Sequence, residues 1–331
     1  MSAILQWTGA QGEGFWYNDE LSDLLRTELK PRTRFRQLCD TDDGAQRKGL
    51  HKGEKYRWNI YGKLSRQGRA LAELDPMPMA NFDLSQAELT ITEYGQGVPV
   101  TGKLLSLAKH DAESIVEKAL RDDARQALDI AAWTQFDLTK LRASAAASTT
   151  SITLDEDATP TETNAVALST GHVKAIVDTM RERNIPGFTD DDDYVAVSHP
   201  STFRRLADEW ETINQYTDLG HNRIFNGEKG RYEGTRFLEQ NFIPKGGADD
   251  STTFDPYTPT ADAWDGGFSS WAFFIGGDTV NEAVVVPEEI RGMIPQDFGR
   301  SHGIAWYALL GYGLVHTVAS QARIVKWDSA T

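Results

Sequence analysis

Apolar side chains recur at helical spacing along one uninterrupted stretch of the chain, roughly residues 110–141. No Gly or Pro occurs in this stretch, and its apolar positions include Ala112, Ile115, Val116, Ala119, Leu120, Ala127, Leu128 and Ala131. This spacing predicts a long amphipathic helix. At about 1.5 Å per residue the helix would be on the order of 45 Å long, which exceeds the width of a small domain. We expect it to form the spine of the subunit.

Two segments before this helix alternate apolar with polar residues. The apolar positions are Tyr56, Trp58 and Ile60 in the first segment and Leu89 and Ile91 in the second. A period of two predicts strands with one apolar face. The stretch between and before them is polar and rich in glycine, so the two strands are predicted to form a long extended hairpin that no local core buries.

The second half of the chain has the pattern of a compact mixed α/β unit. It contains an amphipathic helical pattern at 170–183, a short strand pattern at 194–197, and a further helical pattern at 202–210 after Pro200. The stretch 142–160 is rich in Ala, Ser and Thr and is predicted to be a surface linker. A domain boundary is expected there.

Strand patterns dominate the C-terminal region, at 272–275, 283–286, 302–316 and 321–327. The run 304–310 is apolar on both faces, which predicts a strand buried within a sheet. Gly311 and Gly313 follow it and indicate a bulge or a close backbone approach.

Composition narrows the class of protein. The 331 residues are 40% hydrophobic, enough for a sizeable core, and this length favours two packing units or one elongated subunit. One cysteine, Cys39, excludes an internal disulfide, and the 7 histidines are too dispersed for a zinc site. No apolar run approaches the roughly 20 residues of a membrane helix, and the N-terminus lacks the order of a signal peptide. We expect a soluble protein without membrane contacts.

Charge is unevenly distributed along the chain. The net charge is −15, so the whole molecule should repel nucleic acid, yet 47–69 carries +7 and leaves −22 for the remainder. This basic stretch either stacks on nucleic acid through its aromatic residues or lies on the acidic body of an identical neighbour. We favour the second interpretation. The candidate subunit-contact residues are Arg47, Lys48, Lys52, Lys55, Arg57, Trp58, Lys63, Arg66 and Arg69.

Catalytic motifs with adequate spacing are missing from the sequence. It has no phosphate-binding Gly-Lys-Ser/Thr loop, no His-Glu-x-x-His motif and no Gly-x-Ser-x-Gly turn. The acidic run Asp190, Asp191, Asp192 and Asp193 lacks the alternating ligands of a calcium loop, so we expect a solvated acidic loop. A less favoured alternative is an acidic metal-dependent enzyme that uses this run with His199. We expect no catalytic residues, no cofactor and no metal.

Three short segments, in their order, are typical of one family. They are LTITEYGQGVPVTG at 89–102, AVSHPSTFRRL at 196–206 and GTRFLE at 234–239. With the arm, hairpin, spine helix and α/β unit, they resemble the major capsid proteins of tailed bacteriophages with the α+β Hong Kong 97 type fold. The resemblance implies an N-terminal arm at 1–39, an extended loop (E-loop) at 40–94, a peripheral domain with the spine helix at 95–142, an axial domain at 143–277, and return strands of the peripheral domain with the C-terminus at 278–331.

The same resemblance implies a structural function. The protein would assemble with itself into hexamers and pentamers, in the host cytoplasm, and form the icosahedral virion shell around the genome. About forty residues precede the hairpin, which implies a separate scaffolding protein; a portal and decoration proteins are further expected partners, and packaged DNA would be contacted only locally. The alternative is an encapsulin-like or other virion shell protein.

Overall fold

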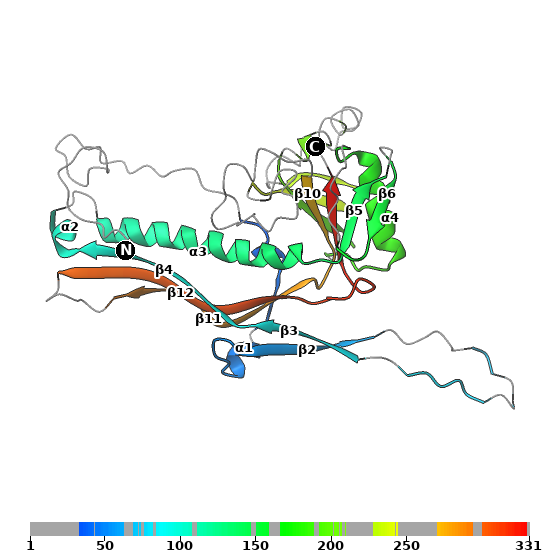
Figure 1. Ribbon diagram of the computed structural model, residues 1–331, viewed down its shortest axis with the longest axis horizontal. Helices are drawn as coiled ribbons and strands as arrows, with labels where there is room; N and C mark the ends of the chain where they lie inside the picture. The colour runs from blue at the N-terminus through cyan, green and yellow to red at the C-terminus, as the bar shows by residue number, and fades with distance from the viewer. Residues whose placement is uncertain are drawn as a thin grey trace.

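Two sheets, one long helix and a projecting hairpin make up an elongated subunit (Figure 1). The two sheets have four and seven strands, and the hairpin forms a separate two-stranded sheet. The computed structural model describes residues 33–42, 44–62, 69–71, 73, 76–81, 84–107, 111–146, 150–158, 166–188, 192–200, 202–204, 206, 209, 228–241, 243, 270–293 and 300–329. The predicted arm therefore lies outside the described residues except for its last few positions.

The predicted spine is helix α3, Ala112–Asp137. Its N-terminus is capped by Asp111, whose carboxylate accepts hydrogen bonds from the backbone N–H groups of Glu113 and Ser114 at 3.1 and 3.4 Å. The helix ends four residues before the predicted limit, because the Thr139 hydroxyl donates to the carbonyl of Ile324 at 2.7 Å and draws the chain towards a sheet. Among the helices of the described ranges, none is long and apolar enough to cross a membrane.

The four-stranded sheet runs along α3 (Figure 1). Its order is β1-β11-β12-β4, so β12 has a neighbour on each side, which confirms the prediction of a strand inside a sheet. Apolar residues of α3 at intervals of four, such as Val116, Leu120 and Ala124, bury one stripe against it. The bounds are β1 Asp40–Asp42, β4 Thr92–Thr101, β11 Val280–Gly292 and β12 Ser301–Leu314, with the short helices η1 Arg36–Leu38, α1 Gly44–Arg47 and α2 Gly102–Leu107 beside them.

The seven-stranded sheet is buried on both faces. Alternate residues of β7 belong to different cores: Val195 and Val197 to the core around α3, and Tyr194 and Ala196 to the core under helix α4 (Thr170–Glu182). This double burial explains the apolar run from Tyr194 to Val197 in β7. In sheet order the strands are β6 Ile152–Asp155, β5 Leu141–Ala145, β13 Ile324–Ser329, β10 Ser270–Ile275, β7 Tyr194–Ser198, β9 Thr235–Glu239 and β8 Glu228–Tyr232.

One sequence expectation about this sheet is wrong. The stretch 142–160 is not simply a linker, because β5 and β6 from it pair with each other and β5 pairs with β13. Short Ala, Ser and Thr side chains occur in strands as well as in loops, so the composition of this stretch was not sufficient to predict a linker. The strand at 321–327 joins the seven-stranded sheet as β13, so a division at residue 278 does not follow sheet membership. Of the predicted helix at 202–210, only residues 202–204, 206 and 209 are among the described residues.

The hairpin consists of β2 (Lys55–Tyr61) and β3 (Leu84–Thr90), and its base crosses the four-stranded sheet. A Cβ on Gly311 would lie 2.5 Å from the carbonyl oxygen of Thr90, and one on Gly313 would lie 2.7 Å from the Cβ of Leu89. This confirms the close approach predicted for these glycines. The expectation that no local core buries the hairpin is wrong for its base, which shares a small core with the sheet formed by Ala45, Tyr56, Leu89, Ile91, Ala283 and Leu309.

Replacing Gly311 with Ala should therefore destabilise the subunit by about 1–3 kcal/mol, because the backbone of β3 must move to admit the methyl group. Urea unfolding of the unassembled subunit measures the change. Gly292→Ala is the matched control, since a Cβ there meets nothing within 4 Å. Equal stability of the two variants would show that the crossing is looser than described.

Candidate functional site

Three basic side chains of the predicted basic stretch pair with an acid of β3, Glu88, or an acid at the start of β4, Glu93. Lys52 Nζ lies 2.6 Å from Glu93 Oε2, and Arg57 Nε lies 2.9 Å from Glu88 Oε2, while the other oxygen of Glu88, Oε1, accepts from Lys55. Hydrogen bonds from Lys55 and Arg57 lower the pKa of Glu88, and the hydrogen bond from Lys52 lowers that of Glu93. All of these groups are exposed, so each pair contributes little to stability.

The predicted charge separation is consequently smaller than the basic strand alone suggested. The return segment 70–93 contains no Lys or Arg and five acids, Glu73, Asp75, Asp83, Glu88 and Glu93, so the whole hairpin 47–93 has a net charge of +2. The remainder of the chain then carries −17 instead of −22. The five acids of the return segment offset most of the +7 of the basic run, and two of them, Glu88 and Glu93, pair directly with basic residues.

The other predicted contact residues are divided between the base and the exposed surface. Trp58 is half-buried, with its ring edge against Gly313, and Lys48 Nζ lies 4.7 Å from the centre of the Tyr56 ring. Arg47 and Arg69 are exposed. The remaining two, Lys63 and Arg66, lie outside the described residues.

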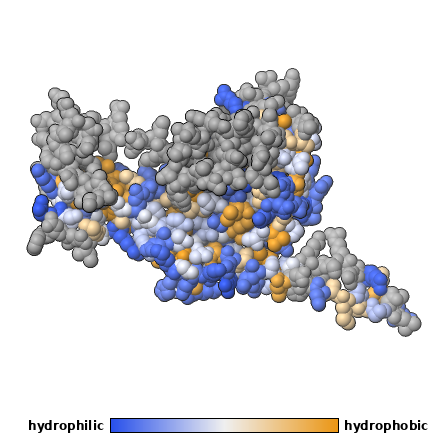
Figure 2. All heavy atoms as spheres, viewed as in Figure 1, coloured by the Kyte–Doolittle hydropathy of each residue, from blue (hydrophilic) through white to orange (hydrophobic). Residues whose placement is uncertain are grey.

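Large apolar side chains gather on the outer part of the hairpin, which the sequence analysis missed. Met79 is 91% exposed, Tyr61 74%, Met77 72% and Leu84 61%. Figure 2 shows pale orange atoms among the blue and grey ones of the projecting hairpin. The available signal was Met-Pro-Met at 77–79, in a segment otherwise rich in polar residues. An exposed apolar surface of this kind marks an interaction site.

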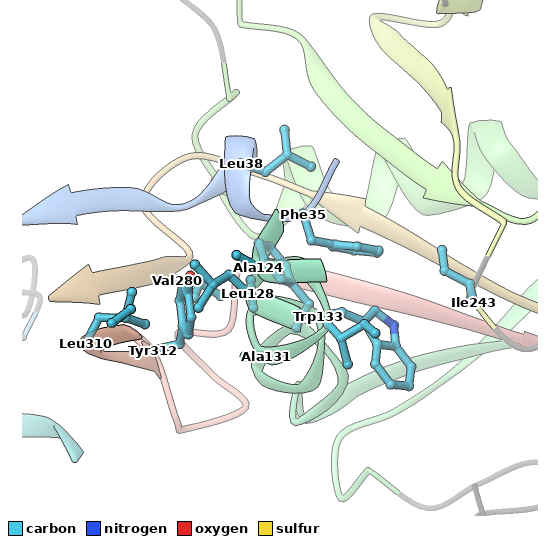
Figure 3. Close-up of a cluster of buried hydrophobic side chains, with 14 of the residues drawn as sticks. Phe35, Leu38, Ala124, Leu128, Ala131, Trp133, Ile243, Val280, Leu310 and Tyr312 are labelled. Carbon is cyan, nitrogen blue, oxygen red and sulfur yellow. The ribbon is translucent and has the colours of Figure 1, made fainter. Parts of the chain in front are cut away.

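The root of the arm, 34–39, is held by a carboxylate buried inside α3. Asp129 is fully buried and accepts from the backbone N–H groups of Arg34 and Arg36 at 3.1 and 2.9 Å, and from the Gln240 amide at 3.1 Å. Phe35 between them packs on Phe136 and Phe273, with ring centres 5.3 and 5.8 Å apart. Figure 3 shows Phe35 and Leu38 beside the buried residues of α3. Burial raises the pKa of Asp129 to about 6.

The Arg36 side chain ties this root to the four-stranded sheet. Its guanidinium contacts the buried carboxylate of Glu282 and the exposed one of Glu288, each at 2.9 Å. Glu282 also accepts a hydrogen bond from the Tyr312 hydroxyl at 3.0 Å. The arm root is therefore attached to α3, β11 and β12 together.

The end of the acidic run 190–193 is not the solvated loop that was expected. Asp193 is buried, and its two oxygens accept from Arg231 at 2.5 Å and Arg236 at 3.3 Å. Asp192, at φ +60°, accepts from the backbone N–H of Gly187 at 2.9 Å. The first two Asp residues of the run lie outside the described residues. Within the described ranges, no three His, Cys, Asp or Glu residues are grouped to hold a metal ion.

Comparison with known proteins identifies the family. A family model described as phage capsid protein matches residues 86–326, more than two thirds of the chain. The chain belongs to the phage capsid protein family. Residues 89–102, 196–206 and 234–239, whose sequences carried the resemblance, all fall within the match. A search of curated proteins gives no match.

Solved capsids share the fold of this capsid protein. The capsid of cyanophage P-SCSP1u has a TM-score of 0.66 at 12% identity, covering 95% of this chain and 93% of that one. The capsid of Ralstonia phage GP4 has a TM-score of 0.64 at 13% identity, covering 100% and 98%. The capsid of cyanophage Pam1 has a TM-score of 0.63 at 14% identity, covering 95% and 96%. The fold is the α+β Hong Kong 97 type.

Family and fold together establish a structural major capsid protein of a phage head. This assignment favours a phage shell over an encapsulin-like compartment, and a structural protein over an acidic metal-dependent enzyme. The ion pairs of Asp193 with Arg231 and Arg236 agree with a structural role for this acidic residue. For a structural role, the residues of interest are those that hold the arm and the hairpin in position.

Asp129→Asn should change how stability depends on pH. Because the folded-state pKa of about 6 lies above the ordinary 3.8, the folded protein binds a proton more readily than the unfolded chain does. The contribution of Asp129 to stability therefore falls as pH rises from about 4 to about 6 and is constant above that. The decline is on the order of 3 kcal/mol, and the Asn variant should lack it. Urea unfolding of the unassembled subunit at several pH values measures this.

Glu113→Gln, an exposed acid in the first turn of the same helix, is the matched control and should keep the wild-type pH profile. If Asp129→Asn and Glu113→Gln gave the same profile, the carboxylate of Asp129 would not titrate as its burial requires.

Proposed function

We propose that the subunit builds the hexamers and pentamers of an icosahedral phage shell by laying its hairpin over a neighbouring copy. The observation that supports this most directly is the group of exposed apolar side chains on the outer hairpin, with Met79 at 91% and Tyr61 at 74% exposure. A second copy of the chain is the partner present at the same concentration, and burying these side chains against it removes them from water.

Magnitudes decide which part of the hairpin holds the contact. Burying a large apolar side chain contributes about 1.5–3 kcal/mol, whereas an exposed ion pair contributes about 0–1 kcal/mol. The apolar tip therefore supplies most of the affinity, and the basic residues set orientation and register on the acidic neighbour. The proposed orienting residues are the basic Arg47, Lys48, Lys52, Lys55, Arg57, Lys63, Arg66 and Arg69, together with Trp58 between them.

The domain division is the one that the family resemblance implies: 1–39 for the arm, 40–94 for the extended loop, 95–142 for the peripheral domain, 143–277 for the axial domain and 278–331 for the return strands. We propose one change to these bounds. Strands β5 and β13 belong to the axial domain, because both lie in the seven-stranded sheet.

Further partners are proposed from the family. They are a separate scaffolding protein, a portal and decoration proteins, with assembly in the host cytoplasm. The net charge of −15, and of only +2 on the hairpin, supports a local contact with packaged DNA rather than an extended one.

The purified protein should form shells or capsomers, because its apolar hairpin surface is uncovered in the isolated subunit. Light scattering over a range of salt and protein concentrations measures the mass. A single species near the 36.8 kDa of one chain under every condition would contradict self-assembly.

The double change Met77→Ser and Met79→Ser should slow assembly at every salt concentration, because the lost contact is apolar. Reversing Lys52, Arg57, Lys63 and Arg66 to Glu should also slow it, but raised salt should produce part of that defect in the wild type, since ions screen exposed charges over about 8 Å. Assembly kinetics by light scattering compare these variants. Met293→Ser, a less exposed methionine outside the hairpin, is the matched control.

If the methionine variant assembled normally, the exposed apolar side chains of the hairpin would not be part of the contact. If the charge-reversed protein formed normal empty shells and failed only to retain DNA, its basic residues would contact the genome instead of a neighbour.

A further inference from the structure

A groove lies where the base of the hairpin, the end of α3 and the end of β12 meet. Its volume is about 540 Å³, within the range of roughly 300–1,000 Å³ in which proteins bury small ligands. Its apolar lining includes Leu89, Tyr94, Ala131, Leu138 and Leu314. The groove therefore has room for side chains from another segment.

Exposed apolar side chains of the subunit body gather at this groove. Outside the hairpin, the large apolar side chains that the described residues expose are Leu138 at 60%, Val318 at 54% and the less exposed Met293. Leu138 lines the groove, and Val318 directly follows Thr317, which also lines it. Met293 lies elsewhere, against Gly303. Two exposed apolar side chains beside a groove mark an interaction surface.

The polar groups of the groove favour an apolar segment with acids beside it. The Thr134 hydroxyl donates to the carbonyl of Ala131 at 2.7 Å, so it needs no partner from outside. Glu88, at the hairpin side of the groove, already makes two ion pairs. Lys140 is exposed and is the one cation among the described residues of the lining. An acid on the partner would complement this lysine.

We propose that this groove receives Met77 and Met79 from the hairpin of a second copy of the chain. Both side chains are exposed, and methionine is unbranched and flexible, which suits an irregular apolar groove. The return segment 70–93 around them contains five acids and no Lys or Arg, so it complements Lys140. The inference rests on the proposed hairpin contact and names the surface that the hairpin meets.

The positions of the methionines and the groove on one chain suit the formation of rings. Residues 76–81 lie on the projecting part of the hairpin, whereas the groove lies at the hairpin base (Figure 1). Two different surfaces of the chain would therefore meet. A contact of this kind repeats head to tail and closes into a ring when the rotation allows it, as hexamers and pentamers require.

Cross-linking between copies tests the groove. Every chain carries Cys39→Ala, which removes the single natural cysteine. A chain with Met79→Cys is assembled together with a tagged, longer chain that has Leu138→Cys, and a short bismaleimide then joins nearby thiols. The linked product should contain one chain of each length. Met293→Cys in the tagged chain is the matched control and should give little of this product.

The N-terminal arm is the other segment of the chain with several large apolar residues, so it is tested as a competing occupant. A chain with Trp16→Cys takes the place of the one with Met79→Cys and should not link to Leu138→Cys. A product from this pair, without one from Met79→Cys, would assign the groove to the arm and overturn the proposal.

Assembly measured by light scattering gives an independent readout. Leu138→Ser and Met79→Ser should each raise the protein concentration required for assembly about tenfold, because each removes one buried apolar side chain. The two changes together should add little to either one, since both remove the same contact. Circular dichroism checks that each variant is folded.

The outcomes separate the groove from the hairpin contact itself. If Met79→Cys links to Met293→Cys instead, or if Leu138→Ser assembles like the wild type while the methionine variants are slow, the groove is wrong and the hairpin contact stands. If no pair of chains links and the methionine variants also assemble normally, both proposals are wrong.

Discussion

Helix α3 packs against two different sheets, and the rest of the subunit depends on this packing. Its first half buries one stripe on the four-stranded sheet, while its second half is buried on several sides, including Ile130, Trp133 and Phe136. A helix shared in this way joins the two sheets into one core, because side chains from both interlock around it. The elongated shape follows, since a helix of about 39 Å sets the length of the sheet that covers it.

Three buried charged groups lie where separate parts of the fold meet this core, and each has a hydrogen-bond or ion-pair partner. Asp129 accepts a hydrogen bond from the backbone N–H of Arg36 in the arm root, and Glu282 forms an ion pair with the Arg36 side chain. Lys326 of β13 forms an ion pair with Asp137 at the end of α3, at 2.5 Å. Losing one partner of a buried pair is much more costly than losing an apolar contact of the same area, so such pairs specify one arrangement. In a shell protein this matters, because the arm and hairpin must leave every copy in positions that a neighbour can meet.

The hairpin combines a fixed base with an exposed tip. Two glycines of β12 let the backbone of β3 cross the sheet at van der Waals distance, and Tyr56 and Leu89 anchor the base. Beyond this anchor, Lys52 and Arg57 pair with Glu93 and Glu88, and large apolar side chains such as Met79 are exposed.

Local patterns were sufficient to predict the long helix, the strands of the hairpin, the apolar central strand and the close approach at Gly311 and Gly313, because period, burial and backbone freedom are properties of neighbouring residues. The order of three short segments was sufficient to identify the family. Pairing between distant residues was not predictable in the same way. The pairing of β5 with β6 and β13, the burial of Asp129 and Asp193, and the ion pairs of the basic strand all depend on which segments meet in three dimensions, and only the tertiary structure decides that.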